Sequence, residues 1–195
     1  MTNNLDGLIE KTLPNLIYNS SQGFIIGIDG RAGSGKTTLS NKILNRFQAV
    51  KSIALDEFHF PKDSESDQKY DYKRLIKEVI KPFKEGIFPI KYQRYNFGDA
   101  KGLDFDGLDE WITIEKCNIL IIEGFSISVL NGYCDLSIWV ESDPLVSIDR
   151  AVKRNTEEYG LLPMSKAQKE KWANSQENWI TQNKPMEIVD LVVGN

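Results

Sequence analysis

Residues 24–37 read FIIGIDGRAGSGKT and are the most informative segment of the chain. Its first half is a run of strand-forming residues, and its second half matches the phosphate-binding pattern Gly-x-x-x-x-Gly-Lys-Thr at every fixed position. The apolar residues Leu39, Ile43 and Phe47 then fall four apart, which predicts a helix from Lys36 onward. A strand, a glycine-rich turn and a helix in this order are the context in which the pattern binds polyphosphate.

The residue types in this loop suit the binding of a phosphate chain. Glycines let the backbone turn with its N–H groups pointing inward, and the start of the following helix adds positive potential. Lys36 is expected to reach the β- and γ-phosphates, and the Thr37 hydroxyl is expected to ligate Mg²⁺. The alternative is a glycine-rich turn with a structural role only. The residues expected to bind the nucleotide are Gly30, Ala32, Gly33, Ser34, Gly35, Lys36, Thr37 and Thr38.

Composition indicates the class of protein. The chain has 195 residues, which is enough for one sizeable core, and we expect a single domain over 1–195. Its net charge of −4 argues against a nucleic-acid partner. No apolar run approaches the roughly 20 residues of a membrane span, and the first residues lack the features of a secretory signal, so we expect a cytoplasmic protein without a membrane partner. Cys117 and Cys134 lack metal-ligand spacing and are expected to be buried free thiols.

The rest of the chain alternates short apolar runs with segments of helical periodicity. Strands are expected at 24–28, 52–56, 117–124, 134–141 and 187–193. Helices are expected around Leu5, Leu8, Ile9 and Leu13, from Lys36 onward, and around Leu75 with an end near Pro82 and Gly86. Another is expected from Pro144 through Arg154. The last is expected to begin at a capping box of Ser165 and Gln168, with Trp172 and Trp179 as its packing stripe. Residues 61–70 are expected to form a loop. Such alternation implies a three-layer α/β fold, in which a five-stranded parallel sheet is covered on both faces and ligands bind at the carboxyl ends of the strands.

Residues 88–114 interrupt this alternation. They are rich in aromatic residues and contain three glycines, which predicts a β-hairpin or an irregular insert. Tyr92 and Arg94 are candidates for contact with an acceptor substrate, because aromatic faces stack on bases and a guanidinium binds a sugar hydroxyl or a carboxylate. The alternative is that the aromatic residues pack the insert on the core, and Trp111 is expected to do so.

Two carboxylates are expected near the phosphate-binding loop, at the carboxyl ends of strands. Glu123 ends the apolar run ILIIE, where it suits Mg²⁺ bound directly or through water, and the alternative is a surface glutamate. Asp56 ends the second strand, where it suits the acceptance of a hydroxyl proton, and the alternative is a cap of a helix or turn. Glu57 is expected to point the other way. His59 is either a polar loop residue or a contact of the substrate or of Asp56.

Basic residues follow the fourth predicted strand. Arg150 and Arg154 are four apart and therefore lie on one face of the predicted helix. We expect a lid region over 150–163 in which these two residues neutralise charge on a transferred phosphoryl group. The alternative is a solvated basic end of a helix.

The chain resembles the uridine kinase family of P-loop kinases, which also includes relatives acting on phosphoribulose and pantothenate. The matching pieces, in the family's order, are IGIDGRAGSGKTTLS, ALDEFHF, YDYKRLIKEVIKPFKEG, YQRYNF, ILIIEGF and DLSIWVESDPLVSIDRAVKRN. The resemblance implies a P-loop NTPase fold with the P-loop strand at the centre of five parallel strands. It also implies ATP on residues 30–38, Asp56 as base near the acceptor hydroxyl, Glu123 near Mg²⁺, Tyr92 and Arg94 near the acceptor, and Arg150 and Arg154 in the lid.

The expected function is therefore that of a kinase with ATP and Mg²⁺ as cofactors, which phosphorylates a hydroxyl of a small, nucleoside-like molecule. The catalytic residues are expected to be Lys36, Asp56, Arg150 and Arg154. The sequence DEFH replaces the family's usual DSFY, and NTEEYGLLP replaces a further arginine-rich stretch, so another small hydroxyl compound is left open as acceptor. A P-loop ATPase or nucleotide-dependent switch is the remaining alternative, and a homo-oligomer is left open.

Overall fold

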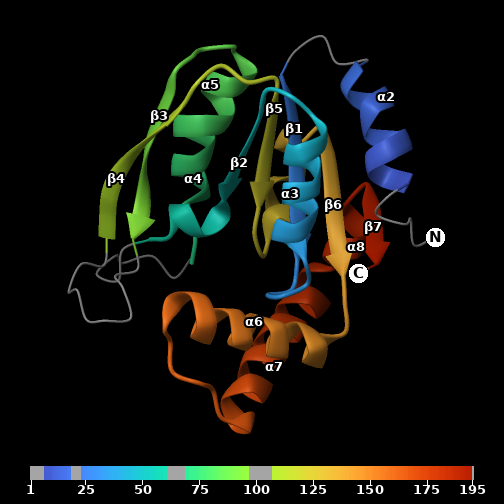
Figure 1. Ribbon diagram of the computed structural model, residues 1–195, viewed down its shortest axis with the longest axis vertical. Helices are drawn as coiled ribbons and strands as arrows, with labels where there is room; N and C mark the ends of the chain where they lie inside the picture. The colour runs from blue at the N-terminus through green and yellow to red at the C-terminus, as the bar shows by residue number, and fades with distance from the viewer. Residues whose placement is uncertain (1–6, 19–22, 61–68, 97–106, 195) are drawn as a thin grey trace.

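The computed structural model describes residues 7–18, 23–60, 69–96 and 107–194. At its centre is a five-stranded sheet with the order β2-β5-β1-β6-β7, in which all neighbouring strands are parallel (Figure 1). The strands are β1 (Phe24–Gly30), β2 (Val50–Ala54), β5 (Ile119–Glu123), β6 (Leu136–Glu141) and β7 (Leu191–Gly194). The P-loop strand β1 lies in the middle of the sheet, as predicted.

Two apolar cores, one on each face of the sheet, give the fold its three layers. Neighbouring residues of a strand point to opposite faces, so Ile25 of β1 joins one core, while Ile26 and Ile28 join the other. Phe83 belongs to the first core and Leu39 to the second. The helical elements are η1 (Leu8–Thr12), α2 (Leu13–Tyr18), α3 (Lys36–Arg46), η2 (Leu55–Phe58), α4 (Tyr72–Leu75), η3 (Ile76–Ile80), α5 (Lys81–Lys84), η4 (Ile127–Tyr133), α6 (Pro144–Tyr159), α7 (Lys166–Asn183) and α8 (Pro185–Ile188). The predicted three-layer α/β fold is confirmed.

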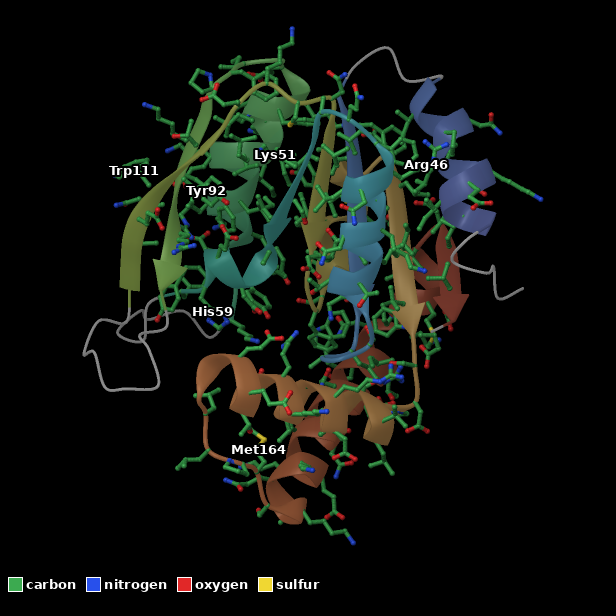
Figure 2. All side chains as sticks on the ribbon, in the orientation of Figure 1. Arg46, Lys51, His59, Tyr92, Trp111 and Met164 are labelled. Atoms are coloured by element: carbon green, nitrogen blue, oxygen red, sulfur yellow. The ribbon has the colours of Figure 1, made fainter. Side chains whose placement is uncertain are left out.

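The insert at 88–114 contains a two-stranded antiparallel hairpin. Its strands are β3 (Ile90–Asn96) and β4 (Gly107–Ile114). Tyr92 pairs with Ile112 across the hairpin, and both side chains face the first core. Trp111 lies on the opposite face of the hairpin and is 63% exposed (Figure 2). The prediction of a core position for Trp111 is wrong, because the two-residue period of the strand turns its side chain outward.

Some strand boundaries differ from the prediction. β2 covers 50–54 rather than 52–56, and Asp56 lies in the short 3₁₀ helix η2 that follows it. The last strand begins at Leu191 rather than at residue 187, because Pro185 starts the short helix α8. Cys117 and Cys134 are free thiols that lie just before strands, and Cys117 is buried while Cys134 is half-buried.

The two C-terminal helices begin where the sequence predicts. The Asp143 carboxylate accepts hydrogen bonds from the N–H groups at the start of α6, and Pro144 is the first residue of that helix. Ser165 and Gln168 form the predicted capping box of α7. Both helices lie across the carboxyl end of the sheet (Figure 1), which is where ligands bind in parallel sheets.

Several predictions fall on parts of the chain outside the described residues. These are Leu5, residues 61–68 of the predicted loop and residues 97–106 of the insert. In the four described ranges, no helix combines the length and the apolar character that a bilayer span requires.

Candidate active site

The glycines of the phosphate-binding loop are required by its backbone and by its packing. Gly33 has a φ of +76° and Gly35 a φ of +103°, both in the region that favours glycine. A Cβ on Gly33 would lie 2.0 Å from the carbonyl oxygen of Ser147 in α6. The loop therefore packs directly against α6, the helix on which the predicted lid arginines lie.

Lys36 is half-buried at the start of α3, where its ammonium faces the carbonyl groups of the loop. Its Nζ donates hydrogen bonds to the carbonyl oxygens of Gly30 and Arg31, each at 2.8 Å. Burial lowers the pKa of Lys36, while the negative charges of nearby carboxylates, including Glu123 and Asp56, act in the opposite direction. The lysine thus contacts the loop and lies within electrostatic reach of both predicted carboxylates.

Thr37 and Glu123, the two predicted metal ligands, meet at the carboxyl end of the sheet. The Thr37 hydroxyl donates to the two carboxylate oxygens of Glu123 at 2.9 and 3.1 Å. Burial raises the pKa of Glu123, and the positive charges of Lys36 and Arg154 oppose this effect. A hydroxyl and a carboxylate are hard oxygen ligands that suit Mg²⁺, which keeps several of its waters and needs few protein ligands. The residues present therefore fit a magnesium ion.

Asp56 presents its carboxylate at the same end of the sheet, with 60% of its side chain exposed. The Tyr70 hydroxyl donates to Asp56 Oδ1 at 2.9 Å, and His59 Nε2 lies 3.8 Å from the same oxygen. The Asp56 charge acts on both Lys36 and Glu123, so the three predicted groups share one electrostatic environment. Of the two alternatives for His59, the structure favours contact with Asp56, and Figure 2 shows it at the end of the sheet that faces α6.

The two acceptor candidates of the hairpin occupy different environments. Tyr92 is 1% exposed, its ring stacks on Phe58 with centroids 5.1 Å apart, and its hydroxyl donates to Glu57 Oε2 at 2.5 Å. The packing alternative therefore describes Tyr92 better than direct stacking on a base. Arg94 is half exposed and forms an ion pair with Glu110 of the neighbouring strand, with Nη2 and Oε2 2.8 Å apart.

The two lid arginines differ in their relation to the loop. Both are exposed on α6. The positive charge of Arg154 acts on Lys36 and on Glu123, so Arg154 lies near the site. Arg150 forms no ion pair with any other residue in the described ranges. The structure therefore brings the charge of Arg154 within electrostatic reach of the predicted site.

Comparisons with known proteins agree with this geometry. A uridine kinase of Staphylococcus aureus (strain JH9) is 30% identical over 152 residues, which is 70% of this chain and 70% of the relative. The chain belongs to the uridine kinase family of P-loop kinases. A uridine kinase of Limosilactobacillus reuteri (strain DSM 20016) is 26% identical over 157 residues, covering 74% of this chain and 70% of the relative. The NB-ARC domain family matches residues 5–87, which include the P-loop and are less than half of the chain.

A solved structure supports the fold of this kinase. The structure of a possible uridine kinase from Bacillus stearothermophilus superposes with a TM-score of 0.64 over 97% of this chain and 96% of the other, at 14% identity. Because the chain belongs to the uridine kinase family, it is a P-loop kinase that binds ATP and transfers a phosphoryl group. Membership of the uridine kinase family leaves the acceptor and the role of each site residue to be proposed from the geometry.

One residue that sequence reasoning missed, Asp29, joins the kinase's P-loop strand to the segment after β5. Its side chain is buried and accepts hydrogen bonds from the N–H groups of Gly30, Ser126 and Ser128 at 2.7, 2.9 and 2.8 Å. Burial raises the pKa of Asp29, and these hydrogen bonds oppose the shift. The sequence did carry a signal for this buried carboxylate, because Asp29 is an acidic residue inside an otherwise apolar strand.

A second missed residue, Arg74, supports the turn that carries Asp56. Its guanidinium donates to the carbonyl oxygens of Glu57 at 2.9 Å and of Gln93 at 2.6 Å, and lies 4.7 Å from the ring centroid of Phe58. Arg74 therefore connects η2 to the hairpin. Its partners are backbone carbonyls, which have no signature in the sequence.

Proposed function

We propose that this kinase transfers the γ-phosphate of ATP to a hydroxyl of a small, nucleoside-like molecule, with Mg²⁺ held by Thr37 and Glu123. The observation that carries the proposal is the position of Asp56. Its carboxylate is exposed to an incoming substrate and lies within the electrostatic reach of Lys36 and Glu123. A P-loop with a carboxylate poised beside it suits transfer to an alcohol better than simple nucleotide binding.

In this proposal the chain's own groups divide the work between phosphate and acceptor. The loop N–H groups and Lys36 bind and orient the phosphate chain, and Arg154 adds positive charge from α6. Mg²⁺, when bound, would neutralise charge on the β- and γ-phosphates. Asp56 accepts the hydroxyl proton of the acceptor as the acceptor oxygen bonds to the γ-phosphorus, the bond from that phosphorus to the β–γ bridging oxygen breaks, and ADP leaves.

Tyr70 prepares Asp56 for the acceptance of that proton. Burial raises the pKa of Tyr70, and the neighbouring Asp56 charge raises it further. The phenol therefore stays protonated and donates its hydrogen bond to Asp56 Oδ1. This bond leaves Asp56 Oδ2 for the acceptor hydroxyl.

The nucleoside-like acceptor is proposed from the names of the relatives, which are uridine kinases. The hairpin supports a second candidate, a small hydroxyl compound without a base. The ring of Tyr92 is buried against Phe58, and Arg94 is paired with Glu110, so both residues have partners within the protein. An acceptor panel separates these two candidates.

The test is an ADP-release assay with ATP, Mg²⁺ and a panel of nucleosides, sugars, hydroxy acids and pantothenate. We expect turnover that depends on one acceptor class, and a nucleoside as the best acceptor if the first candidate is correct. A Glu85→Gln variant, altered at an exposed residue after α5, serves as the matched control and should retain full turnover. Turnover that is independent of every acceptor would contradict the proposal and would favour an ATPase or switch.

A further inference from the structure

Arg31 is a charged residue inside the phosphate-binding loop, yet its side chain turns away from the loop into the protein. It is 6% exposed, and its guanidinium binds both carboxylate oxygens of Glu177 in α7, with Nε–Oε1 at 2.6 Å and Nη2–Oε2 at 3.1 Å. Its Nη1 also donates to Glu141 Oε1 at the end of β6, at 2.8 Å. This two-pronged pairing fixes the direction as well as the charge of the arginine.

The next loop residue is also held by α7. The N–H of Ala32 donates to Oε1 of Gln176, at 2.7 Å, and the Gln176 side chain is buried. Two consecutive residues of the loop are thus bound by two consecutive residues of one helix. Ala32 was expected to bind the nucleotide, but its N–H is used by Gln176, and the N–H of Ser34 donates to the carbonyl oxygen of Arg31 at 3.1 Å.

The same helix contacts the other two segments that form the site. The ring of Trp179 packs on Phe125, two residues after Glu123, with ring centroids 4.7 Å apart. Lys169 forms a 2.6 Å ion pair with Asp149 of α6, the helix of the lid arginines. α7 therefore touches the loop, the segment after the metal-binding strand and the lid helix.

The charges at this contact point to a role in nucleotide binding. Glu141 and Glu177 are two carboxylates close to a loop that must accept a highly negative phosphate chain. Arg31 lies between them and offsets part of their charge. A lysine at this position would keep the positive charge, but it would lose the planar fork that matches Glu177.

We propose that α7 is the positioning element of the nucleotide site, and that Arg31 is the positioning residue through which Glu177 fixes the loop for ATP. The proposal rests on the proposed function only in taking Mg²⁺–ATP as the ligand of the loop. Arg31 does not contact the nucleotide. It acts by holding the backbone that does.

The test is isothermal titration of the intact chain with Mg²⁺ and the non-hydrolysable ATP analogue AMP-PNP. We expect about tenfold weaker binding for Arg31→Lys and for Glu177→Gln. The Arg31→Lys/Glu177→Gln double variant should bind about as weakly as the weaker single variant, because one shared contact is lost in all three. Glu170→Gln, which removes an exposed ion pair with Lys166 on the same helix, should bind like the wild type.

A structural role alone gives a different result. If Arg31→Lys and Glu177→Gln lower only the melting temperature and leave the dissociation constant for AMP-PNP unchanged, the proposal is overturned. The same holds if both variants bind AMP-PNP with wild-type affinity and keep a wild-type melting temperature. Circular dichroism is used to check that each variant is folded. In turnover assays, support for the proposal is a raised KM for ATP with an unchanged KM for the acceptor.

Failure of the proposed function is visible separately. If the wild type binds AMP-PNP but shows no acceptor-dependent turnover, the kinase proposal fails, while weakened binding by the variants still supports the role of α7. If the wild type does not bind AMP-PNP at all, both proposals are overturned.

Discussion

The nucleotide side and the acceptor side of this site are held in place by different kinds of contact. On the nucleotide side, Arg31 is buried and pairs with Glu177, which is 146 residues away in the chain. On the acceptor side, Asp56 has 60% of its side chain exposed and is bound by Tyr70, only 14 residues away. Substitutions on the first side should change stability and nucleotide affinity together. Substitutions on the second side should change turnover with little effect on nucleotide affinity.

Gly33→Ala is the most severe test of the nucleotide side. The new Cβ would lie 2.0 Å from the Ser147 carbonyl oxygen, at a φ of +76° that alanine rarely adopts. Strain and overpacking together should cost about 3 kcal/mol of the free energy of unfolding and should abolish ATP binding. Urea denaturation measures the first effect, and calorimetric titration measures the second. Gly132→Ala, where a Cβ meets nothing within 4 Å, is the control, and equal effects of the two variants would contradict the account.

Arg74→Met is the corresponding test of the acceptor side. The variant loses hydrogen bonds to the carbonyl oxygens of Glu57 and Gln93, so the turn that carries Asp56 should shift. We expect kcat to fall about tenfold or more, since small misplacements of a catalytic group are costly, while the dissociation constant for AMP-PNP stays unchanged. Arg46→Met, at an exposed position on α3, is the control. If Arg74→Met binds AMP-PNP more weakly than the wild type, the expectation that acceptor-side substitutions leave nucleotide affinity unchanged is wrong.

Tyr70→Phe makes a smaller change on the acceptor side. It removes one hydrogen bond to Asp56 Oδ1 and leaves the ring in place. A hydrogen bond of this kind contributes about 1 kcal/mol, which corresponds to a roughly fivefold lower kcat. Steady-state kinetics at saturating ATP measure the effect. Unchanged kcat would show that Tyr70 does not prepare the base.

The pH dependence of Mg²⁺ binding should show the smallest effect. Burial raises the pKa of Glu123 above its ordinary value of 4.5, so this carboxylate becomes protonated at a higher pH than an exposed glutamate. Mg²⁺ affinity should therefore weaken as the pH falls towards that raised pKa, because only the ionised form is a good ligand. Mg²⁺ titrations of AMP-PNP binding, repeated at several values between about pH 5 and about pH 7.5, measure the change. Glu123→Gln should retain only the pH dependence of the nucleotide itself, and an identical profile in both proteins would contradict the assignment.

In the ligand-free protein, the contribution of Glu123 to stability should change with pH in the opposite direction to the Mg²⁺ affinity. A raised pKa in the folded state means that the folded protein holds the proton of Glu123 more tightly than the unfolded chain does. The contribution of Glu123 to stability is therefore largest below pH 4.5 and falls as the pH rises through the raised pKa. Asp29 has a raised pKa for the same reason and contributes with the same sign.

Local patterns predicted the fold and the edge of the sheet at which the candidate site residues lie. The P-loop is contiguous in the sequence, and the carboxyl ends of parallel strands meet at one edge, so Thr37, Glu123 and Asp56 are brought together by topology. Two-residue alternation also shows which residues of the hairpin share a face with Trp111. It does not show which of the two faces packs on the core. The face of a strand that is buried depends on what packs against it.

Contacts between distant residues could not be predicted in this way. Arg31 and Glu177 are joined only because α7 crosses the carboxyl end of the sheet, and no periodicity in the sequence encodes that crossing. A buried charge requires a partner, so a charged residue in a glycine-rich loop was a signal that a partner exists. It did not indicate which of the acidic residues is the partner.

Asp56 is proposed to accept the acceptor's proton beside a nucleotide that is held independently of it, and Asp56→Asn is the sharpest test of this role. The measurement combines calorimetric titration with Mg²⁺–AMP-PNP and steady-state turnover with the best acceptor, on the same preparation. We expect a dissociation constant for the analogue like that of the wild type, with kcat lower by about 10² to 10⁴. Turnover close to that of the wild type would contradict it.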